Sequence, residues 1–298
     1  MSQSTVAVLM PGDMGHAVGR ALREGGRDVI TCVTGRSDAT RDMAVRAGMR
    51  LLPAFTDIAR EADLILSILP PAAAAAQAQA VCAAMQEVGR RPVFVDCNAI
   101  SPKTVQQIGD TVGRAGAAFL DAGIIGLAPG KGTPPRFYVS GADPNPLMAL
   151  DGLGIEVRAI GETIGQASAL KMTYAGLTKG TWTLQTAVLL AARQTGVLDD
   201  LLAEFGHSQK AALAAMRGQI PRLPADSARW IGEMEEIAAT FADAGVTPDF
   251  HTGAAEIFRV LASTPLAEET RETIDASRTL EQALAVYCDH LGRPDEAD

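Results

Sequence analysis

The sequence predicts an α/β protein in which a doubly wound parallel sheet is followed by an all-helical domain, with one long helix joining the two. Two observations support this fold class. Short apolar runs alternate with helical stretches over roughly the first 150 residues, and short connections between such elements are typical of a parallel sheet. From residue 166 onward, every predicted element is a helix.

Six short apolar runs in the first half of the chain predict strands, and two of them end at proline. The predicted strands are residues 5–10, 28–33, 63–69, 92–96, 118–121 and 136–140. The helices predicted between them are residues 13–25, 40–47, 72–88 and 102–114. The stretch 72–88 is rich in alanine and lacks glycine and proline, which favours a helix.

Residues 166–195 contain no proline and predict a single helix. Such a helix would be about 45 Å long, which exceeds most helices of globular proteins, so we expect it to link two domains. Further helices are expected at residues 198–217, 225–244, 251–262 and 267–292. We therefore predict a sheet domain over residues 1–162 and a helical domain over residues 163–298.

Composition and charge exclude several classes of function. The chain has 298 residues, of which 47% are hydrophobic and 20% charged, as in an ordinary folded enzyme. Its net charge of −9 disfavours nucleic acid as a partner. No apolar stretch predicts a membrane span, and the N-terminus lacks signal-peptide features. The cysteines and histidines are scattered without metal-ligand spacing, so we expect a reducing cytoplasmic location and no metal site.

A glycine-containing turn, residues 10–15, joins the first predicted strand to the first predicted helix. Gly12 and Gly15 match the second and third glycines of the dinucleotide-binding pattern G-x-G-x-x-G, whereas Met10 replaces the first. Gly12 would let the backbone approach a pyrophosphate, and the following helix N-terminus adds N–H groups and a positive dipole. The turn predicts a dinucleotide contact through residues that include Asp13 and Met14. The other interpretation is a glycine-rich turn without a ligand.

The end of the second predicted strand indicates which dinucleotide binds. An acidic residue there usually contacts the ribose 2′-hydroxyl of NAD. Here the segment is Thr34-Gly35-Arg36-Ser37, which has no carboxylate. Arg36 and Ser37 offer hydrogen-bond donors to a 2′-phosphate, and Arg41 follows one turn later. We therefore predict NADP, with NAD as the less favoured cofactor; the alternative is that Arg36 is a solvent-exposed side chain without a ligand.

Lys171 lies early in the long predicted helix, among small and apolar neighbours. A lysine amine whose pKa is lowered by burial or a nearby cation exchanges a proton near neutral pH. At about 100° per residue, Tyr174, Thr178 and Lys179 share the helix face of Lys171. Taken alone, this pattern favours a structural lysine whose stem packs at a surface between domains.

Together these segments resemble the β-hydroxyacid dehydrogenase superfamily, which includes 3-hydroxyisobutyrate and 6-phosphogluconate dehydrogenases. That family combines a Rossmann domain, a long linking helix and an all-helical C-terminal domain, and the resemblance covers nearly the whole chain. It is carried by residues 12–15 (GxMG), Leu69-Pro70, residues 96–102 (DCNAISP), residues 121–126 (DAGIIG) and residues 165–171 (GQASALK). The resembling branch joins a 6-phosphogluconate-dehydrogenase-like cofactor domain to a helical domain of unknown function.

Five positions depart from the family pattern. Ile125 stands where the family has a carboxylate-binding serine, and Ala175 stands where it has an asparagine. Tyr174 occupies a position that is His or Asn in many members, and Gly232-Glu233 replaces a Lys-Asp pair. These departures indicate a less polar pocket and leave the substrate open.

The resemblance implies an NADP(H)-dependent oxidoreductase that acts on a small hydroxy acid or on its aldehyde or ketone. Lys171 would be the general acid or base, and Tyr174 would orient the substrate oxygen. The expected cofactor contacts are Gly12, Asp13, Met14, Gly15, Thr34, Arg36, Ser37, Leu69, Pro70 and Asn98. The expected substrate contacts are Asn98, Gly123, Ile124, Ile125, Tyr174 and Thr178.

Three alternatives stay open. The first is an imine reductase, although many imine reductases replace the lysine. The second is an oxidoisomerase of a branched sugar acid, and the third is an NADP-binding sensor without turnover. The resemblance also implies a homodimer formed through the helical domain. Lys131, in a flexible Gly-Lys-Gly tip, either reaches an anionic substrate or is simply solvated.

Overall fold

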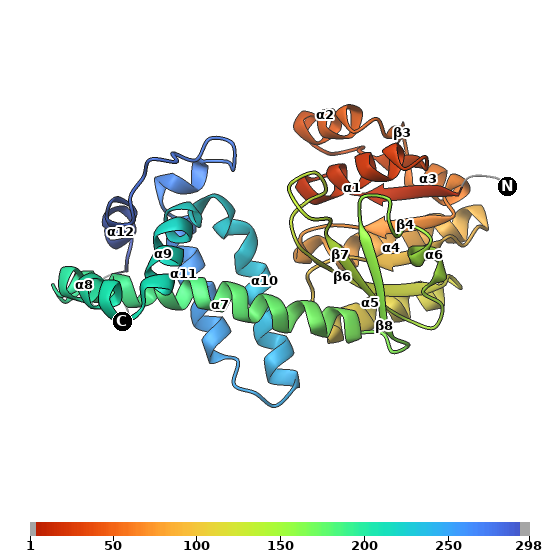
Figure 1. Cartoon of the computed structure of the whole chain (residues 1–298). Coiled ribbons are helices and arrows are strands. Elements are labelled where there is room, and N and C mark those ends of the chain that lie inside the picture. Colours follow the sequence, from red (N-terminus) through yellow and green to blue (C-terminus); the bar gives the residue numbers. More distant parts are fainter. Residues whose placement is uncertain (1–3, 293–298) are drawn as a thin grey trace. The chain divides into compact units, whose positions relative to one another are not determined.

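The structure is a computed structural model and describes residues 4–292 (Figure 1). The chain forms two compact units, residues 1–172 and residues 173–298. The division falls inside one long helix, ten residues after the domain boundary expected from the sequence. None of the helices in the described part of the chain has the length and apolar character needed to cross a membrane.

The first unit contains one eight-stranded sheet with the strand order β3-β2-β1-β4-β5-β6-β7-β8. Its strands are β1 (Thr5–Leu9), β2 (Asp28–Cys32), β3 (Arg50–Leu52), β4 (Leu64–Ser67), β5 (Val93–Asp96), β6 (Phe119–Ile125), β7 (Arg136–Ser140) and β8 (Glu156–Gly161). Strands β1 to β6 are parallel, which confirms the doubly wound arrangement. One edge of the sheet departs from the parallel pattern, because β7 is antiparallel to β6 and parallel to β8.

Helices cover both faces of this sheet and bury two hydrophobic clusters. The helices are α1 (Asp13–Glu24), α2 (Asp38–Arg46), α3 (Phe55–Glu61), α4 (Pro71–Val88), α5 (Pro102–Arg114) and α6 (Asn145–Met148). One cluster includes Leu22 of α1 and Leu147 of α6, and the other includes Ile58 of α3 and Met85 of α4. Because β1, β4 and β5 are parallel neighbours, the loops that follow them gather at one edge of the sheet.

Helix α7 (Gln166–Gln194) confirms the predicted long helix and is the extended green helix in Figure 1. The remaining helices are α8 (Leu198–Ser208), α9 (Lys210–Gln219), α10 (Pro224–Asp243), α11 (Asp249–Ala262) and α12 (Leu280–Cys288), with 3₁₀ turns at Ile220–Arg222 and Pro265–Glu268. The single helix expected over residues 198–217 is in fact two helices. Gln209 leaves the helical conformation, with φ −136° and ψ 46°, and so separates α8 from α9.

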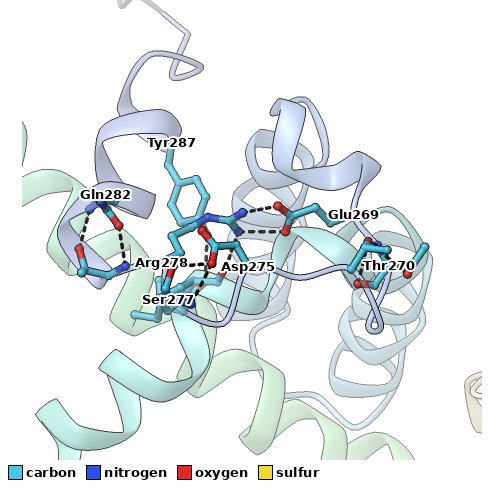
Figure 2. Close-up of polar contacts among 11 residues, drawn as sticks. Glu269, Thr270, Asp275, Ser277, Arg278, Gln282 and Tyr287 are labelled. Carbon is cyan, nitrogen blue, oxygen red and sulfur yellow. Dashed lines mark hydrogen bonds and ion pairs between the residues drawn. The ribbon is translucent and has the colours of Figure 1, made fainter.

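The helix expected over residues 267–292 is also wrong, because only residues 280–288 are α-helical there. Figure 2 shows the polar contacts that hold the preceding segment in an irregular path. Arg278 binds the carboxylate of Glu269 and donates to the carbonyl of Pro221 at 3.2 Å. Asp275 accepts hydrogen bonds from the backbone N–H and hydroxyl of Ser277, at 2.9 and 2.6 Å. These contacts satisfy backbone and side-chain groups locally and compete with the helix.

Candidate active site

The glycine turn lies at the carboxyl end of β1 and leads directly into α1. A Cβ atom added at Gly12 would meet no protein atom within 4 Å, so the space beside this glycine is open. A Cβ added at Gly15 would lie 2.1 Å from the carbonyl oxygen of Met10, so the helix packs against the turn as closely as glycine allows. Because α1 begins at Asp13, the N–H groups of its first turn lie next to the open space. This geometry fits the pyrophosphate of a dinucleotide.

The segment after β2 is exposed and lies at the same edge of the sheet. The side chain of Thr34 donates to the carbonyl of Pro53 at 2.6 Å. Ser37 caps α2, and its hydroxyl oxygen accepts from the N–H of Thr40 at 3.3 Å. Arg36 is exposed, and its guanidinium makes no hydrogen bond or ion pair to other residues in the described range. Its donors are therefore available to a phosphate.

Asn98 follows β5, and its side chain ties the end of β4 to the end of β5. Its Oδ1 accepts from the N–H of Leu69 at 2.5 Å, while its Nδ2 donates to Asp96 at 2.8 Å and to Ser67 at 3.1 Å. The residue is only 2% exposed. Asn98 thus fixes the Leu69-Pro70 turn after β4, and both of its amide protons are used within the protein.

Asp96 and Asp121 are buried carboxylates that lie in register on neighbouring strands β5 and β6. Burial raises the pKa of Asp96 to about 7, hydrogen bonds from Asn98 oppose this shift, and the charge of Asp121 adds to it. Burial also raises the pKa of Asp121, against hydrogen bonds donated by Ser168, Gly165 and Ser140. Neither carboxylate reaches solvent, so both act on the site only through other residues.

Lys171 lies in the second turn of α7, still within the first unit, and is half-buried. Its stem packs against β6: a Cβ atom added at Gly123 would lie 2.9 Å from Cβ of Lys171 and 2.7 Å from the carbonyl oxygen of Ala167. The structure therefore brings together Gly123 and Lys171, which the sequence proposes as a substrate contact and the acid–base group.

The residues after Gly123 do not form a loop. Ile124 and Ile125 continue β6 and pair with Phe137 and Arg136 of β7. Their side chains are buried, and Ile124 belongs to a hydrophobic cluster of the sheet. Within this unit both side chains are therefore packed as core residues.

Tyr174 and Thr178 follow on the same helix, in the second unit. Tyr174 is 51% exposed, and the hydroxyl of Thr178 donates to its carbonyl oxygen at 3.0 Å. Lys179, the second amine on this face, is buried and forms an ion pair of 2.8 Å with Glu233 of α10. Trp230 lies beside this pair, with its ring centroid 5.8 Å from Nζ of Lys179. The pair fixes α7 against α10, so Lys179 is occupied structurally.

Lys131 lies next to the dinucleotide turn. Its ammonium is 3.7 Å from the carboxylate of Asp13, the first residue of α1. The loop between β6 and β7 thus places a cation at the helix N-terminus expected to bind phosphate, and it balances the negative charge of Asp13 there.

Sequence reasoning missed the buried polar side chains that support the site, among them Ser67, Ser140 and Ser168. The available signal was their position, because Ser67 ends β4, Ser140 ends β7 and Ser168 lies in the first turn of α7. A polar residue at the end of a parallel strand, such as Ser67, faces the edge where loops gather. Ser140 lies on the antiparallel strand β7 opposite Asp121, and Ser168 bonds Asp121 across 47 positions, so neither partner is visible in the local sequence.

Comparison with known families matches two parts of the chain. Residues 5–146 match the NAD binding domain of 6-phosphogluconate dehydrogenase, and residues 192–261 match a domain of unknown function, DUF1932. A curated relative, an uncharacterized 28.5 kDa protein from Methanothermus fervidus, is 29% identical over 177 residues, which are 59% of this chain and 66% of that protein. The match thus spans just under two thirds of the relative's length.

Solved structures match along most of the chain. A conserved protein of unknown function, reported as similar to 3-hydroxyacid dehydrogenases, is 26% identical over 86% of this chain and 96% of its own, with a TM-score of 0.66. The 3-hydroxyisobutyrate dehydrogenase of Mycobacterium tuberculosis, with L-serine, is 17% identical over 95% and 99%, with a TM-score of 0.70. An imine reductase from Myxococcus stipitatus, in complex with NADP⁺, is 19% identical over 87% and 93%, with a TM-score of 0.57.

Proposed function

We propose that this chain is a member of the β-hydroxyacid dehydrogenase superfamily and an NADP(H)-dependent oxidoreductase that interconverts a small hydroxy acid and its aldehyde or ketone. The match of residues 5–146 to the NAD binding domain of 6-phosphogluconate dehydrogenase supports a dehydrogenase or reductase that uses a nicotinamide dinucleotide. The observation that carries the finer proposal is the position of Lys171, whose stem lies against Gly123 at the carboxyl end of β6. An amine held at that edge is placed to exchange a proton with a substrate oxygen.

The residues of the first unit fit the cofactor. The open space beside Gly12 and the N-terminus of α1 would hold the pyrophosphate, Arg36 and Ser37 would hold the 2′-phosphate, and Leu69-Pro70 would line the nicotinamide half. When bound, the nicotinamide supplies or accepts the hydride. Lys171 removes the proton from the substrate hydroxyl during oxidation and returns a proton to the oxygen during reduction. Tyr174 hydrogen-bonds the same oxygen and orients it.

Replacement of Lys171 tests the proton-transfer role. We expect Lys171→Ala to lower kcat by about 100-fold or more, the usual effect of losing a general acid or base. The dissociation constant of NADPH stays unchanged, because Lys171 is not among the residues proposed to bind the cofactor. Lys103→Ala, which removes an exposed lysine from α5, is the matched control and keeps full activity. Near-normal turnover by Lys171→Ala contradicts the proposal.

A substrate panel separates the alternatives. Wild-type protein is mixed with NADPH or NADP⁺ and with hydroxy acids, aldehydes, branched sugar acids and cyclic imines, and nicotinamide absorbance is followed. Turnover of hydroxy acids supports the proposal. Turnover restricted to cyclic imines favours an imine reductase, the activity named for one structural neighbour. Tight cofactor binding without turnover of any compound favours a sensor.

The cofactor preference is tested at Arg36. The N–H donors of its exposed guanidinium are not used within the described residues, and a charge-assisted hydrogen bond to phosphate contributes about 1.5–3 kcal/mol to the binding free energy. We therefore expect Arg36→Ala to raise the dissociation constant of NADPH by about tenfold to hundredfold and to leave that of NADH within about twofold. Arg46→Ala, at the exposed end of α2, is the control. The NADP assignment fails if wild-type protein binds NADH more tightly than NADPH and Arg36→Ala changes neither affinity.

We also propose a second copy of the chain as the partner, bound through the helical unit. Three large apolar side chains of that unit are mostly exposed: Leu177 at 76%, Leu184 at 65% and Phe250 at 76%. They line an apolar cavity of about 590 Å³ between α7, α10 and α11.

All four cysteines are free thiols, which supports a reducing, cytoplasmic location.

A further inference from the structure

The first turn of α7 is fastened to the sheet by the side chain of Asp121 in β6. Oδ2 of Asp121 accepts from the N–H groups of Gly165 and Ser168 at 2.9 and 3.0 Å, and Oδ1 accepts from the Ser168 hydroxyl at 2.7 Å. The hydroxyl of Ser140 donates to Oδ2 at 3.1 Å and accepts from the N–H of Ala167 at 3.1 Å. We call this group, Asp121 with Ser140 and Ser168, the α7 clasp.

The clasp satisfies N–H groups that a helix cannot bond internally. The first N–H groups of a helix lack intrahelical partners, and here three of them are bonded to two buried side chains. A carboxylate at a helix N-terminus is also favoured by the helix dipole. Asp121, Ser140 and Ser168 are all buried, so these bonds do not compete with water.

The same strand contacts α7 one turn further along. Gly123 lies two residues after Asp121 on the same face of β6, and the backbone of α7 approaches it so closely that a Cβ atom would meet Lys171 and Ala167. The hydrogen bonds of the clasp fix the position of α7 along β6, and the close packing at Gly123 fixes the distance between the helix and the strand. Lys171 lies three residues after Ser168, so any shift of the first turn displaces the lysine by a similar amount.

We propose that Asp121 is a positioning residue for Lys171: through the α7 clasp it holds the amine where the reacting oxygen binds. This inference rests on the proposed function insofar as Lys171 transfers the proton. Asp121 itself is fully buried and touches no substrate. Because a misplacement of about 1 Å costs up to about 100-fold in rate, a loosened clasp lowers turnover even when the fold persists.

The test compares Asp121→Ala, Asp121→Asn and Thr279→Ala. We expect Asp121→Ala to lower kcat by about tenfold to hundredfold, with the NADPH dissociation constant within about twofold of wild type. Asp121→Asn recovers most of the activity, because its oxygen still accepts from Gly165, Ser168 and Ser140 while its amide donates to the Ser168 hydroxyl. Thr279→Ala is the control. Like Asp121→Ala, it removes a side chain that bonds the first N–H groups of a helix, here α12, and we expect it to leave kcat unchanged.

Hydrogen exchange supplies a readout that does not depend on activity. We expect the amides of residues 165–172 to exchange faster in Asp121→Ala than in wild type, while those of β1 and β4 are unchanged. If Asp121→Ala has the wild-type kcat, calculated per NADPH-binding site, the positioning role is overturned. This holds whether or not the amides of residues 165–172 exchange faster. If Asp121→Ala does not fold, Ser168→Ala removes one contact of the clasp and is expected to show a smaller loss of kcat with the same exchange signature.

Failure of the proposed function gives a different result. In that case wild-type protein turns over nothing in the panel, or Lys171→Ala is as active as wild type. The positioning inference is then decided by the rate at which an amine-acetylating reagent modifies Lys171. A rate that changes in Asp121→Ala supports it, and an unchanged rate overturns it.

Discussion

At the scale of single residues, the site depends on buried carboxylates that lie in register on adjacent strands. Asp96 is fully buried and its pKa is raised to about 7, with burial as the main cause and the charge of Asp121 as a further one. The groups that face it are Asn98, which donates two hydrogen bonds, the buried thiol of Cys97 and the carboxylate of Asp121. An ionised Asp96 is therefore costly at neutral pH, although Asn98 offsets part of the cost.

This raised pKa predicts a pH dependence of stability. The native state binds a proton at Asp96 up to about pH 7, whereas the unfolded chain releases it near its ordinary pKa of 3.8. The stabilisation is thus complete below pH 3.8 and is lost as the pH rises to about 7, with a slope of up to about 1.4 kcal/mol per pH unit. Asp121 adds in the same direction, since its pKa is also raised.

Urea unfolding at several pH values measures this slope. We expect Asp96→Asn to make the free energy of unfolding less dependent on pH between about pH 4 and pH 7, even though the variant loses one hydrogen bond from Asn98. Asp110→Asn, at an exposed position of α5, keeps the wild-type slope. Equal slopes in Asp96→Asn and wild type contradict the assignment.

Residue type alone predicts the presence of a polar site but not the direction of each side chain. The sequence proposes Asn98 as a ligand contact, and the structure shows that its amide atoms bond Leu69, Asp96 and Ser67. Asp96 lies two residues before Asn98, but Leu69 and Ser67 lie about 30 residues away at the end of β4, so no local pattern contains those two partners. Gly12 and Gly15 could be predicted from the sequence because each occupies a fixed offset from a strand or helix start, whereas Lys171 was singled out only by the family resemblance.

At the scale of elements, the sheet and α7 follow from local signals, whereas the C-terminal segment does not. Apolar runs ended by proline or glycine mark β1 and β4, and the absence of proline over thirty residues marks α7. The segment between the last 3₁₀ turn and α12 contains neither glycine nor proline, so no helix breaker marks it in the sequence. It is nevertheless irregular, because Arg278 reaches both Glu269 and the carbonyl of Pro221, a contact across 57 positions of sequence (Figure 2).

The core of the helical unit also depends on contacts between residues far apart in the sequence, which local patterns do not predict. Tyr287 of α12 is fully buried and donates to the carbonyl of Ile220 at 2.9 Å, and burial raises the pKa of its hydroxyl. Trp182, Trp230 and Phe258 pack beside the buried pair of Lys179 and Glu233, with their rings tilted and successive ring centroids 5.4 and 5.3 Å apart. Lys179, two turns beyond Lys171 on α7, is thus structural. Only its ion pair with Glu233 of α10 distinguishes it from Lys171, and the local sequence does not show that pair.

At the scale of the whole molecule, the proposed pairing with a second copy has a defined surface. Leu177 and Leu184 are seven residues apart and therefore lie on one face of α7. Together with Phe250 of α11, which is also mostly exposed, they line one apolar cavity and so form a contiguous apolar surface. An acidic chain of net charge −9 repels its own copies at long range, so apolar contact must supply the attraction.

We therefore expect wild-type protein to have the mass of a dimer by light scattering at micromolar concentration. Leu177→Glu combined with Leu184→Glu places two charges in the contact and is expected to yield a monomer, because each buried, unpaired carboxylate costs several kcal/mol. Val246→Glu, an exposed apolar residue after α10 that does not line the cavity, is the matched control and stays dimeric. Circular dichroism shows whether each variant keeps its helices. A wild-type protein that is monomeric at every concentration rules out the pairing, and a folded double variant that remains dimeric places the contact on another surface.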